Sequence, residues 1–96
     1  MAEAIRVDII HGITNSPVLT MVVRENFDIY RGTQDTIIHA IARNLGIEVD
    51  KSTYDMMAEA VYDVRMNDEV TFFLQDHAGN EHHITLKRGY EKDLFQ

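Results

Sequence analysis

The segment Val70–Leu86 constrains the fold more than any other part of the chain, because it has the pattern of a β-hairpin. Residues 70–74 are a dense run of strand-forming residues, and residues 82–86 alternate between apolar and polar types. Residues 76–80 between them include a glycine and an asparagine, which adopt the positive φ angles of tight turns at little cost. An isolated hairpin is marginally stable in water, so we expect further strands or a helix to cover its apolar face. The residues expected on that face are Val70, Phe72, Leu74, Ile84 and Leu86.

The length of 96 residues allows one domain with one core, and no proline- or glycine-rich stretch marks a linker. We therefore expect residues 1–96 to form a single domain, in which residues 89–96 are a C-terminal tail. The chain has no cysteine, which excludes disulfides, thiolate metal sites and cysteine nucleophiles. A chain of this size without covalent links depends on its core or on a partner for stability.

The charge of the chain limits its partners. The formal net charge is −7, from 16 acidic and 9 basic residues. Phosphate backbones repel such a chain, so we expect no direct nucleic-acid binding and favour a partner with a basic surface. The sequence shows no secretory signal, and its apolar runs are far shorter than the roughly 20 residues that span a bilayer. We therefore expect a cytoplasmic protein without a membrane contact.

Two strands are predicted near the N-terminus. Residues 5–10 alternate between apolar and polar types, which is typical of a strand with one solvated face. Residues 11–17 have turn chemistry. Residues 18–23 are apolar on both faces, which favours a strand that is central or covered on both sides. An extended segment is predicted to continue through residues 27–30 and to end at Gly32.

A first helix is predicted to begin near Gln34, with Thr33 or Asp35 as its cap. Gly46 and Ile47 follow its last turn and are typical of a Schellman stop, in which a glycine ends the helix and the next residue contacts it. Its apolar stripe at helical spacing consists of Ile37, Ile38, Ile41, Ala42 and Leu45.

A second helix is predicted over residues 53–66. Ser52 and Asp55 resemble a capping box at its start, and the pair at residues 67–68 breaks the helical pattern. Its inward face is expected to consist of Met57, Ala60, Val61 and Val64, widened by Tyr54 and Ala58.

The predicted order of elements is β-β-α-α-β-β. Two hairpins can join in one mainly antiparallel four-stranded sheet with two helices on one face, which makes a two-layer α+β sandwich. This order resembles the β-grasp (ubiquitin-like) arrangement at the level of topology only, and the second helix departs from it. A resemblance in topology implies little about function.

Acidic residues recur along the second helix. Asp55, Glu59 and Asp63 stand at i, i+4 and i+8, so they line one face about 6 Å apart along the axis. Like charges at this spacing destabilise a helix slightly, and we expect Lys51 and Arg65 to offset part of that cost. The stripe either recognises a basic surface or is a solvated face that aids solubility. The negative region continues beyond the helix with Asp68 and Glu69.

Exposed aromatic residues are the second candidate for recognition. The rings of Tyr90 and Phe95 lie in the tail, where they either fold back on the core or anchor a partner or a second copy. Phe73 is expected on the open side of the sheet, together with Met21 or Leu19. Such an apolar patch would need a third layer or a dimer.

Three histidines surround the turn of the last hairpin. His77, His82 and His83 lie close to Asp76 and Glu81, and they are the candidate metal ligands. Zinc needs three or four convergent ligands, but neighbouring residues of a strand point to opposite faces. We therefore expect solvated histidines and no metal or other cofactor.

We interpret the sequence as a small acidic, non-enzymatic interaction protein. It would occupy a basic, nucleic-acid-binding surface of a larger protein as an inhibitor or adaptor, as small acidic viral proteins that mimic nucleic acid do. One alternative is a structural subunit or homodimeric scaffold, and another is a metalloprotein or enzyme that uses the hairpin histidines. The predicted partner-binding residues are Asp55, Glu59, Asp63, Asp68, Glu69, Phe73, Tyr90 and Phe95.

Overall fold

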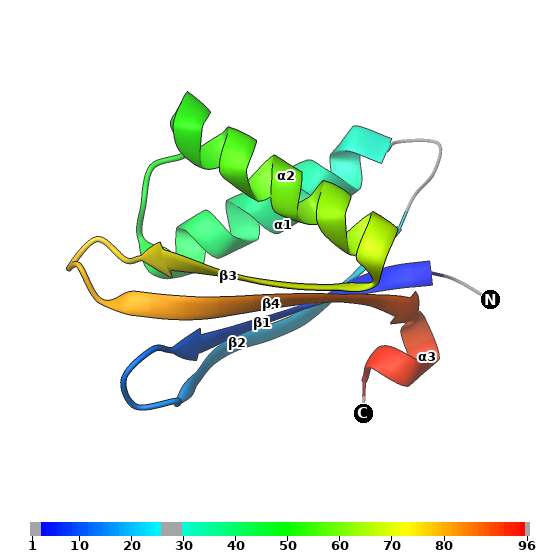
Figure 1. Cartoon of the computed structure of the whole chain (residues 1–96), viewed down its shortest axis with the longest axis horizontal. Helices are drawn as coiled ribbons and strands as arrows, with labels where there is room; N and C mark the ends of the chain where they lie inside the picture. Colours follow the sequence, from blue (N-terminus) through cyan, green and yellow to red (C-terminus); the bar gives the residue numbers. More distant parts are fainter. Residues whose placement is uncertain (1–2, 26–29, 96) are drawn as a thin grey trace.

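The structure, a computed structural model, describes residues 3–25 and 30–95 and contains a four-stranded antiparallel sheet with two helices on one face (Figure 1). The strands stand in the order β2-β1-β4-β3. This arrangement confirms the predicted two-layer α+β sandwich. The elements are β1 (Glu3–His11), β2 (Pro17–Arg24), α1 (Tyr30–Leu45), α2 (Lys51–Asn67), β3 (Glu69–Gln75), β4 (Glu81–Tyr90) and the short α3 (Glu91–Leu94).

The core lies between the helices and the covered face of the sheet. At the centre, Val7 pairs with Leu86 and Ile9 with Ile84, and all four side chains are fully buried. Alternate residues of each strand point to the same face, so these pairs confirm the face that the period-two pattern predicts. The helices contribute the apolar residues Ile37, Ile38, Ile41, Leu45, Met57, Ala60, Val61 and Val64.

The position of β2 differs from the prediction that it would be central or covered on both sides. Strand β2 pairs with β1 and stands at the edge of the sheet. Strand β1 pairs with β4 on its other side, because the first and last hairpins join through these two strands. Among the described residues, strand β2 therefore has one neighbouring strand. Leu19 and Met21 pack towards the core, whereas Val18 is exposed.

Helix α1 begins at Tyr30, earlier than predicted, so Gly32, Thr33 and Asp35 lie inside it and not at its start. Thr36 Oγ1 donates a hydrogen bond to Gly32 O within the helix. Thr33 is buried, and we infer that its packing offsets the poor helix propensity of Gly32. The extended segment predicted over residues 27–30 falls on residues 26–29, which lie outside the described residues, and on Tyr30, which is helical.

The predicted Schellman stop of α1 is confirmed. Ile47 N donates to Ala42 O at 3.0 Å and Gly46 N to Arg43 O at 3.3 Å, which is the bond pattern of this motif. Gly46 has a φ of +66°, a conformation that L side chains rarely adopt.

Helix α2 is capped by Asp50 and not by the predicted Ser52. Asp50 Oδ1 accepts a hydrogen bond at 2.7 Å from the backbone N–H of Thr53, which lies three residues further along the chain. This is the usual contact of an N-cap side chain. The pair at residues 67–68 ends the helix as predicted, because Asp68 has a left-handed φ of 70° and its N–H donates to Val64 O.

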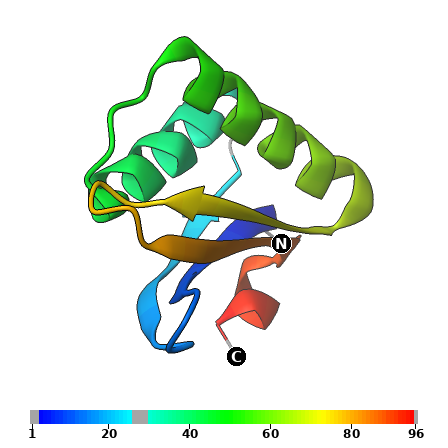
Figure 2. The ribbon, with the colours of Figure 1, turned by 60° about the vertical axis from the view of Figure 1, so that its left-hand side comes forward.

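The tail folds back onto the sheet face opposite the two helices (Figure 2). Residues 89 and 90 belong to β4, and α3 follows directly. Leu94 is buried against Gly89, and Arg6 Nη1 donates to Leu94 O at 2.8 Å. An ion pair of 2.6 Å between Arg24 Nε and Glu91 Oε2 also holds α3.

None of the helices in the described part of the chain combines the length and the apolar character that a bilayer crossing requires.

Candidate protein-interaction surface

The acidic stripe lies on the outer face of α2, away from the core. Asp55 and Glu59 are exposed, and Asp63 is half-buried. Lys51 Nζ forms an ion pair with Asp55 Oδ2 at 2.8 Å, as the sequence predicts. Helix α2 therefore presents the carboxylates of Asp55 and Glu59 to solvent and that of Asp63 in part.

The second expected counter-charge is not on this face. Arg65 is buried and pairs with Glu25, with 2.8 Å between Nη2 and Oε1, so it does not neutralise the stripe. Its position in the helix turns it towards the sheet, next to Val61 and Val64 in the buried face. The exposed Asp68 and Glu69 extend the negative region beyond the end of α2, and Arg65 does not offset it.

Three apolar side chains stand on the same outer face as the carboxylates, and sequence reasoning missed them. Met56 is 38% exposed, Tyr62 60% and Met66 66%. Each lies three or four residues from Glu59 or Asp63 along the helix, so they alternate with the acidic groups. The helical spacing could have predicted their exposure, because these positions lie on the side of α2 opposite its buried residues.

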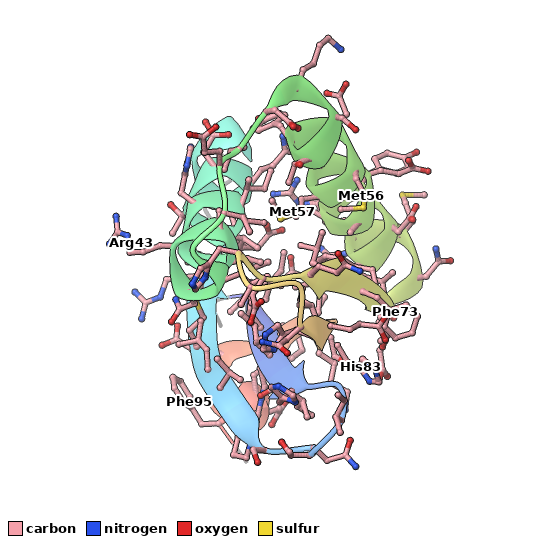
Figure 3. All side chains as sticks on the ribbon, turned by 90° about the vertical axis from the view of Figure 1, so that its left-hand side faces the viewer. Arg43, Met56, Met57, Phe73, His83 and Phe95 are labelled. Atoms are coloured by element: carbon pink, nitrogen blue, oxygen red, sulfur yellow. The ribbon has the colours of Figure 1, made fainter. Side chains whose placement is uncertain are left out.

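Phe73 of β3 borders this surface. Its ring is 57% exposed on the open side of the sheet, as predicted, and stands edge-to-face with His83 at 4.7 Å between centroids. Figure 3 shows Phe73 on the same flank of the molecule as Met56. The prediction that Met21 or Leu19 would lie beside Phe73 is wrong, because both residues pack on the face of the sheet that the helices cover.

The two aromatic residues of the tail are also exposed. Tyr90 is 46% exposed and Phe95 69%, although Leu94 between them is buried. Figure 3 shows Phe95 on the flank opposite Phe73. Phe95 is therefore separated from Met56 and Phe73, whereas Tyr90 is the last residue of β4. We define the α2–β3 surface as Asp55, Met56, Glu59, Tyr62, Asp63, Met66, Asp68, Glu69 and Phe73.

The hairpin histidines have different surroundings, and the expectation that all are solvated is wrong for His82. His82 is buried on the helix side of the sheet, while His83 lies half-buried on the open side. His82 Nε2 lies 2.9 Å from Asp76 Oδ2, and its Nδ1 has no hydrogen-bond partner among the described residues. The ring of His11 stands edge-on to that of His82 at 5.1 Å, and His77 Nδ1 lies 3.4 Å from Leu45 O.

The hydrogen bonds of Asp76 explain its role in the turn. The pKa of this carboxyl lies well below its usual value, first because of the bond to His82 and then because it accepts from the backbone of Asn80 and Ala78. Asp76 is therefore ionised and accepts a hydrogen bond from the Nε2–H of His82. This bond stabilises the turn, so we assign Asp76 and His82 a structural role. Within residues 3–25 and 30–95, no three histidine or carboxylate side chains converge in a way that could hold a metal ion.

A polar depression of about 230 Å³ lies on the open face of the sheet beside α3. Arg6 reaches into it, but its guanidinium is engaged by Asp8 at 2.9 Å and by Leu94 O at 2.8 Å. Those contacts fix α3 to the sheet. No sequence signal predicts this depression, because it depends on where the tail lies. Its lining residues are Arg6, Asp8, Thr85, Lys87, Asp93 and Leu94.

Comparisons of the chain with protein-family models, curated proteins and solved structures give no match, so the α2–β3 surface is interpreted from its geometry and chemistry alone.

Proposed function

We propose that the protein is a non-enzymatic interaction module that binds a basic surface of a larger protein through the outer face of α2. The observation that carries this proposal is the alternation of exposed Met56, Tyr62 and Met66 with exposed carboxylates on one helix face. Large apolar side chains that gather on one exposed face, bordered by polar groups, are typical of a protein-interaction site.

The two classes of side chain have complementary tasks in binding. Carboxylates steer the encounter with a basic partner and select against acidic ones. Tyrosine concentrates binding energy when it is buried at an interface, and methionine adapts its shape to the partner. The repulsion between Asp55 and Glu59 at i,i+4 costs at most a few tenths of a kcal/mol in the free protein, because Lys51 offsets part of it, and a basic partner would relieve the remainder.

A basic groove that normally holds nucleic acid is the partner surface that we favour. Carboxylates at i and i+4 lie about 6 Å apart along the helix axis, which is comparable to the spacing of successive phosphates along a strand. The protein would then act as an inhibitor or adaptor by occupying that groove.

The test is the double charge reversal Asp55→Lys/Glu59→Lys, which spares the half-buried Asp63. A matched control is Glu81→Lys/Asp93→Lys, because it changes the net charge equally at two exposed positions outside α2. Proteins captured from the native host are identified by mass spectrometry, and the affinity of each variant for the captured partner is measured. We expect the α2 variant to lose affinity at an almost unchanged thermal midpoint and the control to retain it. Equal affinity of the two variants would remove α2 from the interface.

A further inference from the structure

Strand β3 has a free edge whose backbone groups point away from the sheet. Arg88 N donates to Asp68 O at one end of the β3–β4 ladder, and Asp76 N donates to Asn80 O at the other. Bonding alternates along an antiparallel ladder, so Val70, Phe72 and Leu74 are the residues that bond to β4. The N–H and C=O groups directed outward belong to Glu69, Thr71, Phe73 and Gln75.

Strand β2 forms the other edge of the sheet and is protected against the addition of a further strand, whereas β3 is not. Strand β2 starts with Pro17, its pairing with β1 shifts between Ile9 and Ile10, and its last residue, Arg24, is tied to Glu91. Proline, register irregularities and basic residues are the usual devices that prevent strand addition at an edge. Strand β3 contains no proline, lysine or arginine, and its register with β4 is continuous. Within the described part of the chain, β4 is the strand that pairs with it.

The free edge lies next to the outer face of α2. Helix α2 crosses above β3 (Figure 1), and Met56 of α2 and Phe73 of β3 lie on one flank (Figure 3). A strand added beside β3 would therefore direct alternate side chains towards the acidic flank of α2 and the others towards the open side near Phe73.

We propose that β3 binds an extended segment of the partner by strand addition, and that this segment carries lysine or arginine at alternate positions. The proposal rests on the proposed function and specifies how the partner is bound. Charge selects the occupant, because alternate basic side chains would face the carboxylates of α2. A second copy of the chain is disfavoured, since pairing of two β3 edges would bring two acidic α2 helices together.

The probe is a synthetic, capped seven-residue peptide that alternates lysine and valine, matched by one that alternates glutamate and valine. Amide hydrogen exchange and chemical shifts of the wild-type protein are followed by NMR during titration with each peptide. We expect the lysine peptide to bind and to protect the outward amides of Thr71, Phe73 and Gln75. The amides of Val70, Phe72 and Leu74 already bond to β4, so their protection should change little.

A variant pair isolates the backbone contribution. Thr71→Pro removes one outward N–H without removing a bond to β4, and Thr71→Val keeps that N–H while both variants lose the threonine hydroxyl. We expect about tenfold weaker binding of the lysine peptide to Thr71→Pro than to Thr71→Val, the effect of roughly one hydrogen bond. If Thr71→Pro does not fold, strand addition is tested by the amide exchange pattern of the wild-type protein alone.

Each contrary result has a distinct meaning. No binding of the lysine peptide at millimolar concentration, or equal binding of both peptides, would overturn the proposed occupant. Binding that shifts α2 signals but leaves the three outward amides unprotected would overturn strand addition while leaving the proposed function intact. Protection that grows with protein concentration in the absence of peptide would show that a second copy occupies the edge, which also overturns the proposal.

Discussion

Arg65 and Glu25 form an ion pair in the interior, with 2.8 Å between Nη2 and Oε1 and side chains that are 6% and 1% exposed. A second arginine extends the contact, because Arg88 Nη1 donates to Arg65 O at 2.9 Å and Arg88 Nη2 to Glu3 at 2.8 Å. Glu3 raises the pKa of Arg88, chiefly through this hydrogen bond. The cluster joins the last turn of α2 to β1 and β4, so it sets the position of the acidic helix over the sheet.

Removal of one member of this pair should cost more than removal of both. Arg65→Ala leaves a buried carboxylate without its partner, and we expect the free energy of unfolding to fall by about 3–5 kcal/mol. The double variant Glu25→Leu/Arg65→Met replaces the pair with apolar side chains of similar size and should cost clearly less. Urea unfolding of Glu25→Leu, Arg65→Met and the double variant measures the coupling between the two side chains, and strictly additive effects would contradict it.

The N-terminus of α2 offers a test of which residue caps it. Asp50→Ala removes the acceptor of the Thr53 N–H and should lower the thermal midpoint, whereas Ser52→Ala should leave it nearly unchanged. Asp50→Asn keeps an acceptor at the same place and should retain most of the stability. Circular dichroism melting of the three variants distinguishes them, and a larger loss for Ser52→Ala would restore the capping box as the start signal.

Sequence patterns predicted the elements well where the pattern is local. The alternation around Ile84 and Leu86, the helical stripe and the stop at Gly46 all depend on neighbours within one turn or one strand. The start of α1 at Tyr30 was missed because tertiary packing of Thr33 compensates for a glycine in the first turn. The edge position of β2 was missed because strand order depends on contacts between distant segments.

The candidate surface was predicted in the same uneven way. The spacing of Asp55 and Glu59 was sufficient to place them outside, but the exposure of Tyr62 on the same arc was overlooked. Burial of His82 could also have been inferred, because it continues the inward alternation of Ile84. The unprotected edge of β3 could not have been inferred, since it exists only because β1 and β4 occupy the centre of the sheet.

Acid should weaken the turn between β3 and β4. The pKa of Asp76 is lower in the folded protein than in the unfolded chain, chiefly because of the bond to His82, so its stabilisation is complete above the unfolded value near 4. That stabilisation is lost as the pH falls below about 4 towards the folded pKa. The thermal midpoint of Asp76→Ala should therefore lie below that of the wild type at pH 7, and the difference should narrow at pH 3. An Asp93→Ala control on exposed α3 should show little difference at either pH, and a gap for Asp76→Ala that widens in acid would contradict the assignment.

Two glycines with positive φ provide a matched pair for the contact between α1 and the last hairpin. Gly46 and Gly79 have φ angles of +66° and +86°, so alanine at either position should cost about 1–2 kcal/mol of backbone strain. A Cβ at Gly46 would also lie 2.9 Å from His77 Nδ1, whereas a Cβ at Gly79 would meet nothing within 4 Å. We therefore expect Gly46→Ala to be the more destabilising variant in urea unfolding. Adding His77→Ala should restore the extra stability lost in Gly46→Ala, because it removes the close contact with the new Cβ. It should restore no stability in Gly79→Ala, where the loss comes from backbone strain alone. Equal destabilisation of the two glycine variants, or no rescue, would show that the turn does not pack against the end of α1 as described.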